Sequence, residues 1–400
     1  GGIDSTLVCG VMSQLTTKLR SFTIGFEQTI YDESTLARKI AGHYGAEFET
    51  VDCTSEKLAD NFEKTVHHVE QPLLNPNSIA KLILSKLVRD RGYKVCLTGE
   101  GADEMFGGYP YFKQELLWEM AKSGEPDDVA LSQSLLKKFY QIEKRSEGSH
   151  WSRDIKGRGP LPSYLKRANF YYLRMSGSKG FINKLFRRDF LKTTTVKSPL
   201  EYFEKTFDTA ALAPLESFNA TRLMTYQFLS QYVFPCVGDR VDMANSIETR
   251  VPFLDPELVE FVNQIPTKHF INIQELKEKN LLRVGFRDLL PRFMDDEYKH
   301  PFMSPNWYRL SRTSTGRQLF PELLSTRLVR EVGVFRPVAV SIATFLWKTL
   351  PQGTTLWRKV DTAIGQVLSI HLLYRNMLQR PDAGDRDFRL VDQTPAASRA

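Results

Sequence analysis

Two glycine-rich turns carry the acidic residues of this 400-residue sequence that are best placed to do chemistry. Gly1–Ser5 (GGIDS) precedes an apolar helix pattern, and Thr98–Asp103 (TGEGAD) follows the apolar run Val95–Leu97. Glycines at the start of a helix let backbone N–H groups approach an anion such as phosphate. Carboxylates there would repel a bare phosphate, so the pattern predicts a divalent cation between acid and phosphate. The alternative for each turn is an ordinary surface turn or helix cap.

The elements around these turns follow the pattern of an α/β protein. Leu7, Val8, Val11 and Leu15 recur at helical spacing, and residues 21–26 alternate polar and apolar side chains as a strand does. The pattern continues with a helix ending near Tyr44, a weaker strand at 46–51, helices at 55–69 and 77–89, and a strand at 94–97. This alternation predicts a parallel sheet covered by helices, with ligands bound at the carboxyl ends of its strands.

The composition excludes several classes of protein. The net charge of +7 comes from 54 basic against 47 acidic residues. The sequence has no dense basic patch with interleaved aromatic residues, so we expect no nucleic-acid partner. No apolar run reaches the ~18 residues of a membrane span, and the N-terminus lacks a signal-peptide pattern. The four cysteines are too widely spaced for a zinc template or a CxxC pair. We therefore expect free thiols and a reducing, cytoplasmic location without a membrane partner.

The rest of the chain divides into regions of different composition and hydrophobic pattern. Residues 121–220 are polar, basic in places and without strand signals, which predicts a helical insertion after an α/β core at 1–120. Residues 221–310 look helical, with one helix at 221–245 interrupted by Pro235 and an amphipathic helix at 277–290. Residues 311–380 predict a C-terminal helical region, and the polar residues 381–400 predict a mobile tail.

Four segments, in order along the chain, resemble one known family. Gly1–Ser5 is similar to the end of the pyrophosphate loop of the N-type ATP pyrophosphatases (the PP-loop superfamily), and Thr98–Tyr109 resembles the synthetase domain of glutamine-hydrolysing asparagine synthetases. Asp239–Asp255 and Lys279–Arg283 (KNLLR) look like further blocks of that C-terminal synthetase domain. The resemblance implies a five-stranded parallel sheet with helices on both faces, the adenine nucleotide alpha hydrolase-like fold, with a large helical addition. We expect its first strand to be truncated here.

The resemblance also implies roles for the matching residues. The β- and γ-phosphates of ATP would be held by Gly1, Gly2, Asp4 and Ser5, with Mg²⁺ bridging to Asp4 and Asp103. The nucleotide would also be lined by Ile24, Thr98 and Gly99. Glu100 would take a proton from attacking ammonia, and Lys279 would neutralise phosphate charge, although a lysine on a surface helix is otherwise a solvated charge. The acceptor substrate would meet Asp103, Asp239, Arg240 and Ser78.

The implied reaction has two steps. An aspartate side-chain carboxylate attacks the α-phosphate of ATP, which gives a β-aspartyl-adenylate and pyrophosphate, and ammonia then displaces AMP to form asparagine. The family's N-terminal glutaminase domain, which releases ammonia from glutamine, is expected to be missing because no N-terminal Cys opens this chain. Many members carry acidic residues where this chain has Phe234-Pro235-Cys236. Two alternatives therefore stand beside aspartate amidation: a catalytically silent ATP-binding or scaffold protein, and a relative that forms a β-lactam by the same adenylation.

Overall fold

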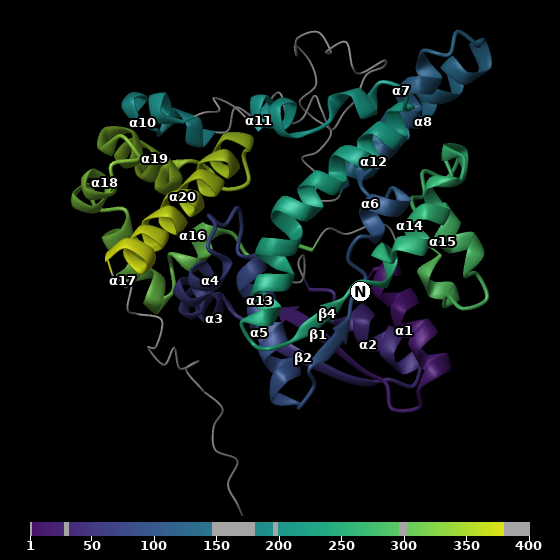
Figure 1. Cartoon of the computed structure of the whole chain (residues 1–400), viewed down its shortest axis with the longest axis horizontal. Helices are drawn as coiled ribbons and strands as arrows, with labels where there is room; N and C mark the ends of the chain where they lie inside the picture. Colours follow the sequence, from purple (N-terminus) through teal and green to yellow (C-terminus); the bar gives the residue numbers. More distant parts are fainter. Residues whose placement is uncertain (1, 28–31, 146–180, 195–198, 296–301, 380–400) are drawn as a thin grey trace, which may run out of the picture.

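The strands of the protein form two small parallel sheets within a mostly helical fold (Figure 1). The computed structural model describes residues 2–27, 32–145, 181–194, 199–295 and 302–379, so Gly1 and the predicted tail at 381–400 lie outside the described residues. β1 (Arg20–Phe26) pairs in parallel with β2 (Glu47–Cys53), and β3 (Val95–Leu97) pairs in parallel with β4 (Glu248–Arg250). The α/β class is confirmed. Because the described residues show four strands in two sheets, the single five-stranded sheet stays a prediction.

The α-helices are numbered along the chain. Those of the first 145 residues are α1 (Ile3–Leu15), α2 (Ser34–His43), α3 (Ser55–Asp60), α4 (Phe62–Val69), α5 (Asn77–Asp90), α6 (Ala102–Phe106), α7 (Pro110–Ala121) and α8 (Pro126–Arg145). The middle of the chain contributes α10 (Arg188–Thr193), α11 (Pro199–Thr206), α12 (Ser217–Phe228), α13 (Asp239–Met243), α14 (Pro256–Asn263) and α15 (Asn280–Gly285). The C-terminal helices are α16 (Trp307–Leu310), α17 (Ser314–Leu323), α18 (Thr326–Val332), α19 (Pro337–Thr349) and α20 (Thr355–Tyr374).

Local backbone signals explain where several predicted helices end. The helix predicted at 55–69 is two helices that meet at Asn61, and Thr54 caps the first by accepting a hydrogen bond from the Lys57 N–H. The second ends at Glu70, whose φ of 54° is left-handed. The stretch predicted to be helical at 221–245 is helical, and the predicted interruption at Pro235 takes the form of a π-helical segment at residues 229–237. Pro235 has no N–H to donate, and the wider π turn accommodates that gap in the hydrogen-bond ladder.

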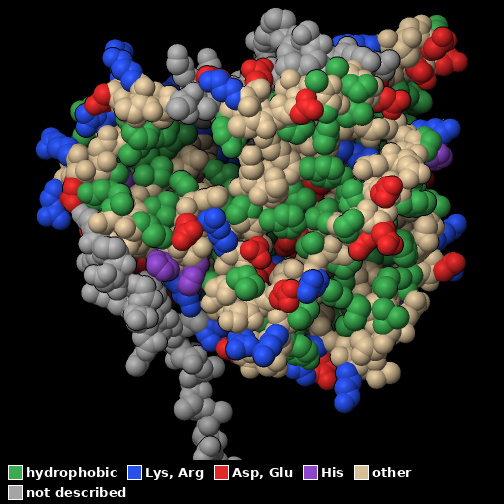
Figure 2. Space-filling model, viewed as in Figure 1, with side chains coloured by type: hydrophobic (Ala, Val, Ile, Leu, Met, Phe, Trp, Pro, Cys, Tyr) green, Lys and Arg blue, Asp and Glu red, His purple; other side chains and the backbone are tan. Residues whose placement is uncertain are grey.

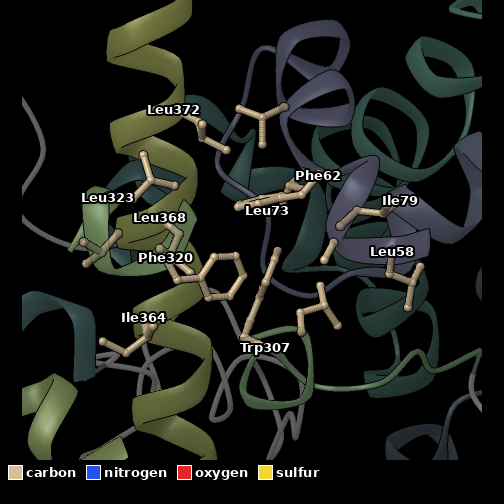
Figure 3. Close-up of a cluster of buried hydrophobic side chains, with 14 of the residues drawn as sticks. Leu58, Phe62, Leu73, Ile79, Trp307, Phe320, Leu323, Ile364, Leu368 and Leu372 are labelled. Carbon is tan, nitrogen blue, oxygen red and sulfur yellow. The ribbon is translucent and has the colours of Figure 1, made fainter. Parts of the chain in front are cut away.

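The largest hydrophobic core joins the α/β part to the C-terminal helices (Figure 3). Phe62 from α4 lies against Trp307 and Phe320, with ring centroids 4.9 and 5.9 Å apart. Leu368 and Leu372 of α20 are fully buried in the same core. The predicted C-terminal helical region is thus packed on the helices of the α/β part and supports them.

A second core holds the two glycine turns together. Ile3 and Leu7 of α1 are buried in the same cluster as Ala102, Met105 and Phe106 of α6, along with side chains of α7 and α12. Each of these two helices begins directly after one of the turns. Burial of their apolar faces in one core therefore fixes the position of one turn relative to the other.

The outer surface mixes charges of both signs. On the face shown in Figure 2, acidic and basic side chains are interspersed among polar and apolar ones. None of the helices in the described part of the chain combines the length and the apolar character needed to cross a membrane.

Candidate active site

The two glycine turns lie directly against each other. A Cβ atom added at Gly99 would come within 2.6 Å of the Asp4 Cβ and 2.8 Å of the Ser5 backbone nitrogen. The backbone before Gly99 is fixed because the Thr98 N–H donates to the Arg250 carbonyl at 3.0 Å, which extends the pairing of β3 with β4. Only a residue without a side chain permits this approach. The N-terminal ends of α1 and α6 thus lie next to each other.

Lys279 joins the acids of the two turns. Its Nζ lies 2.6 Å from both carboxylate oxygens of Asp4 and 2.5 Å from Oδ1 of Asp103. The lysine is 1% exposed, and the carboxylate side chains are 13% and 15% exposed. Buried charges are tolerated where they are paired in good geometry. We call this group of Asp4, Asp103 and Lys279 the phosphate-side cluster.

The backbone places Lys279 in an unusual way. The helix predicted at 277–290 is wrong in extent, because α15 begins only at Asn280 and Lys279 precedes it with a φ of 56°. A left-handed conformation is uncommon for a lysine and persists where the surroundings impose it. Here the buried ion pairs with Asp4 and Asp103 supply that constraint.

A second buried ion pair supports the loop that carries Lys279. Lys113 of α7 donates to Glu278 at 2.7 Å and to the Leu276 carbonyl at 3.2 Å, with both charged side chains at most 6% exposed. Burial acts to raise the pKa of Glu278, but Lys113 and the hydrogen bonds outweigh it and hold that pKa below its ordinary value. Arg283 donates to the Glu278 carbonyl at 3.1 Å. The chain just before Lys279 is therefore held by ionic contacts with α7.

Glu100 belongs to a different cluster on the other side of the second turn. Nζ of Lys81 lies 3.2 Å from its Oε1 and 3.5 Å from Oδ2 of Asp242. Burial acts to lower the pKa of Lys81, yet Glu100 and Asp242 outweigh it and raise that pKa above the ordinary value. Burial raises the pKa of Asp242, which Lys81 and a 2.6 Å hydrogen bond from Thr249 only partly offset. We call this group the acceptor-side cluster.

Sequence reasoning did not single out Lys81. It lies on α5 in the run Ile79-Ala80-Lys81-Leu82-Ile83, whose four apolar members are buried. A lysine within such an apolar run is the signal that could have found it, because lysine is almost never buried unless it is paired.

The remaining predicted site residues are not all brought together. Ser78 is fully buried in the first turn of α5, and its hydroxyl has no hydrogen-bond partner among the described residues. Asp239 is exposed at the start of α13. The Arg240 guanidinium next to it donates to the Val69 carbonyl and lies 3.7 Å from Glu70. Ile24 is 7% exposed within the largest core, so its side chain contributes to packing.

The donor set of the phosphate-side cluster fits a hard cation. Within the described part of the chain, no group of three or more His, Cys, Asp or Glu side chains converges as a complete metal site. Asp4 and Asp103 nevertheless aim their oxygens at one positive charge. Mg²⁺ is usually held by one or two carboxylates together with substrate phosphates and water, so these two residues fit its protein ligands.

Comparison with known proteins identifies the family of the chain. The sequence profile of the asparagine synthase family matches residues 1–371. The chain belongs to the asparagine synthase family. It is 31% identical over 336 residues to the amidase chyE of Penicillium rubens, and the match covers 76% of this chain and 48% of that protein.

Two further relatives match a similar share of the chain. The amidase chry2 of Gibberella zeae is 26% identical over 332 residues, which cover 76% of this chain and 48% of that protein. The glutamine-hydrolysing asparagine synthetase 1 of Bacillus subtilis is 27% identical over 334 residues, which cover 80% of this chain and 48% of that protein. The chain thus spans about half the length of the curated relatives it matches.

Proposed function

We propose that this asparagine synthase family member is an ATP-dependent, amide-forming ligase that adenylates a carboxylate and then aminates it. The observation that carries the proposal is the juxtaposition of Asp4, Asp103 and Lys279 beside two glycine turns at helix N-termini. Helix N-termini and a lysine stabilise the negative charge that develops on a leaving pyrophosphate. Aspartate is the proposed acceptor, and asparagine the product, because a relative carries the name asparagine synthetase.

In the first step the acceptor carboxylate attacks the α-phosphate of ATP. The backbone of Gly2 to Ser5 would face the departing β- and γ-phosphates, and Gly99 lets the second turn pack directly against Asp4 and Ser5. Lys279 turns its ammonium from the two carboxylates toward the phosphate oxygens and neutralises their charge. Mg²⁺, held by Asp4 and Asp103, would supply further charge neutralisation on the phosphates when it is bound.

In the second step ammonia attacks the activated carbonyl carbon and AMP leaves. The nitrogen becomes positive as it bonds, so a carboxylate beside it lowers the barrier by accepting a proton. Glu100 is suited to this role because its side chain is 23% exposed and lies beside the nucleotide-facing turn. We propose glutamine as the source of the ammonia, through a glutaminase domain that is not among these residues, since the Bacillus relative is named glutamine-hydrolysing.

A second candidate function is suggested by the relatives named amidase. In that case the acceptor-side cluster would act on the amide bond of a substrate, and no carboxylate would be activated. Amide hydrolysis requires no nucleotide, whereas the ligase consumes ATP and releases AMP and pyrophosphate. The dependence of the reaction on ATP therefore separates the two candidates.

The test is acceptor-dependent release of pyrophosphate by the intact protein supplied with ATP, Mg²⁺, ammonia and a panel of carboxylates that includes aspartate. We expect Lys279→Met to abolish pyrophosphate release and Glu100→Gln to slow amide formation by about 10²–10⁴-fold. Lys86→Met, which removes a partly exposed lysine paired with Asp90 on α5, is the matched control. Absence of pyrophosphate with every acceptor in the wild type would refute the ligase and favour a silent ATP-binding protein.

A further inference from the structure

Lys81 is a cation whose side chain is only 12% exposed and whose contacts select one oxygen of Glu100. Its Nζ lies 3.2 Å from Oε1, and this is the hydrogen bond that Glu100 makes within the described part of the chain. The other oxygen, Oε2, faces Gly238, where an added Cβ would lie only 3.2 Å away. The Glu100 carboxylate is thus held at Oε1, while its Oε2 makes no hydrogen bond within the described part of the chain.

The lysine itself is firmly anchored. Asp242 lies 3.5 Å from Nζ, and Thr249 of β4 fixes Asp242 with a 2.6 Å hydrogen bond. α5 and α13 are tied together because the Ser85 hydroxyl donates to the Val241 carbonyl at 3.2 Å, and Asn245 donates to the Leu82 carbonyl at 2.9 Å. The cluster therefore spans α5, α13, β4 and the turn that carries Glu100, and the position of Lys81 is set by all of them.

We propose that Lys81 is a positioning residue for the amination step, which holds Glu100 by Oε1 and leaves its Oε2 free to accept the proton of the incoming amine. The inference rests on the proposed ligase function. As the N–C bond forms, the C–O bond to AMP breaks, AMP leaves with the electron pair, and the proton of the amine passes to Oε2.

An ordinary buried ion pair predicts something different. A purely structural Lys81 would affect folding alone, so that its loss would reduce both steps of the reaction in proportion to the folded fraction. A positioning residue affects the step that uses Glu100 more than the step that releases pyrophosphate, which depends on the phosphate-side cluster. The ratio of the rate of ammonia transfer to the rate of pyrophosphate release therefore distinguishes a positioning role of Lys81 from a purely structural one.

The experiment compares Lys81→Met and Lys81→Arg with the control Lys86→Met in single-turnover assays that follow pyrophosphate release and ammonia transfer separately. We expect Lys81→Met to slow ammonia transfer at least ~10-fold more than pyrophosphate release, and Lys81→Arg to restore part of the loss.

A measurement that does not depend on activity completes the test. Urea unfolding of Lys81→Met, Glu100→Gln and the double variant should give non-additive midpoints, because residues in contact are coupled. If Lys81→Met leaves Asp242 unpaired and fails to fold, Lys81→Met/Asp242→Asn removes the stranded charge and takes its place in both assays. Additive midpoints, or equal slowing of both steps, would overturn the proposal. If the wild type releases no pyrophosphate, the ligase function fails, and the unfolding cycle still decides whether Lys81 holds Glu100.

Discussion

Replacing Lys113 by methionine tests whether the loop before Lys279 is held by a buried ion pair. The substitution keeps the apolar stem but leaves Glu278, whose side chain is 2% exposed, without its 2.7 Å partner. Breaking a buried pair by removing one member costs about 3–5 kcal/mol, and the Arg283 guanidinium, 3.5 Å from Oε1 of Glu278, offsets part of that cost. We therefore expect a loss near the lower end of that range in the free energy of unfolding, measured by urea titration at pH 7. Lys86→Met, at a partly exposed pair, should lose at most about 0.5 kcal/mol.

The stability lost in Lys113→Met should change with pH in a definite direction. In the wild type the pKa of Glu278 lies below its ordinary value, so the pair contributes stability above the unfolded pKa, and that stability is lost as pH falls through the folded pKa. Without Lys113 the largest remaining cause is burial, which raises the pKa of Glu278. Protonation then relieves the buried charge, so the deficit of Lys113→Met should shrink between pH 7 and pH 5.

Two further measurements test the Lys113–Glu278 ion pair. Adding Glu278→Gln to Lys113→Met should recover part of the lost stability, because it removes the stranded charge. A deficit below about 1 kcal/mol at pH 7, or one that grows on acidification, would refute the view that this pair is buried and mutually dependent. Pyrophosphate release should fall along with stability, because Glu278 immediately precedes Lys279.

Three other predictions concern the site and the core. Gly108→Ala should abolish pyrophosphate release, since its Cβ would overlap Oδ1 of Asp103, whereas Gly42→Ala, with open space around it, should be active. Asp4→Asn should raise roughly tenfold the Mg²⁺ concentration for half-maximal pyrophosphate release, because the ion loses a carboxylate ligand. Burial raises the pKa of Asp361 from 3.8 to about 6, so its contribution to stability is full below pH 3.8 and is lost as pH rises through 6. At about 1.36 kcal/mol per pH unit, the wild type should lose about 3 kcal/mol relative to Asp361→Asn as pH rises across that window in urea titrations.

The glycine turns were predictable because their signals are local. A glycine that admits a neighbouring backbone, an acid in the first turn of a helix and the apolar strand before it all lie within a few residues of one another, as at Thr98–Asp103. The extent of the helix at Lys279 was not predictable in this way. Its left-handed backbone is imposed by ion pairs to residues far earlier in the chain, Asp4 and Asp103, which no short window of sequence contains.

Lys81 was missed for the same physical reason. On α5 alone it reads as a polar interruption of an apolar helix, and its partner Asp242 lies far along the chain on α13. The π-helical segment that leads to Asp242 also resisted prediction, because its form depends on how Pro235 is accommodated between α12 and α13. The α/β class survives such errors because it depends on the order of elements and not on their ends.

The two lysine clusters explain how one short turn can serve two steps. Glu100 and Asp103 lie close together in sequence, yet the positive φ of 87° at Gly101 directs the chain so that one acid meets Lys81 and the other meets Lys279. Each cluster sets two carboxylates against one lysine ammonium. In the reaction that we propose, the carboxylates of the phosphate side suit a metal ion bound together with the nucleotide. On the acceptor side Glu100 suits an amine that becomes positive as it reacts.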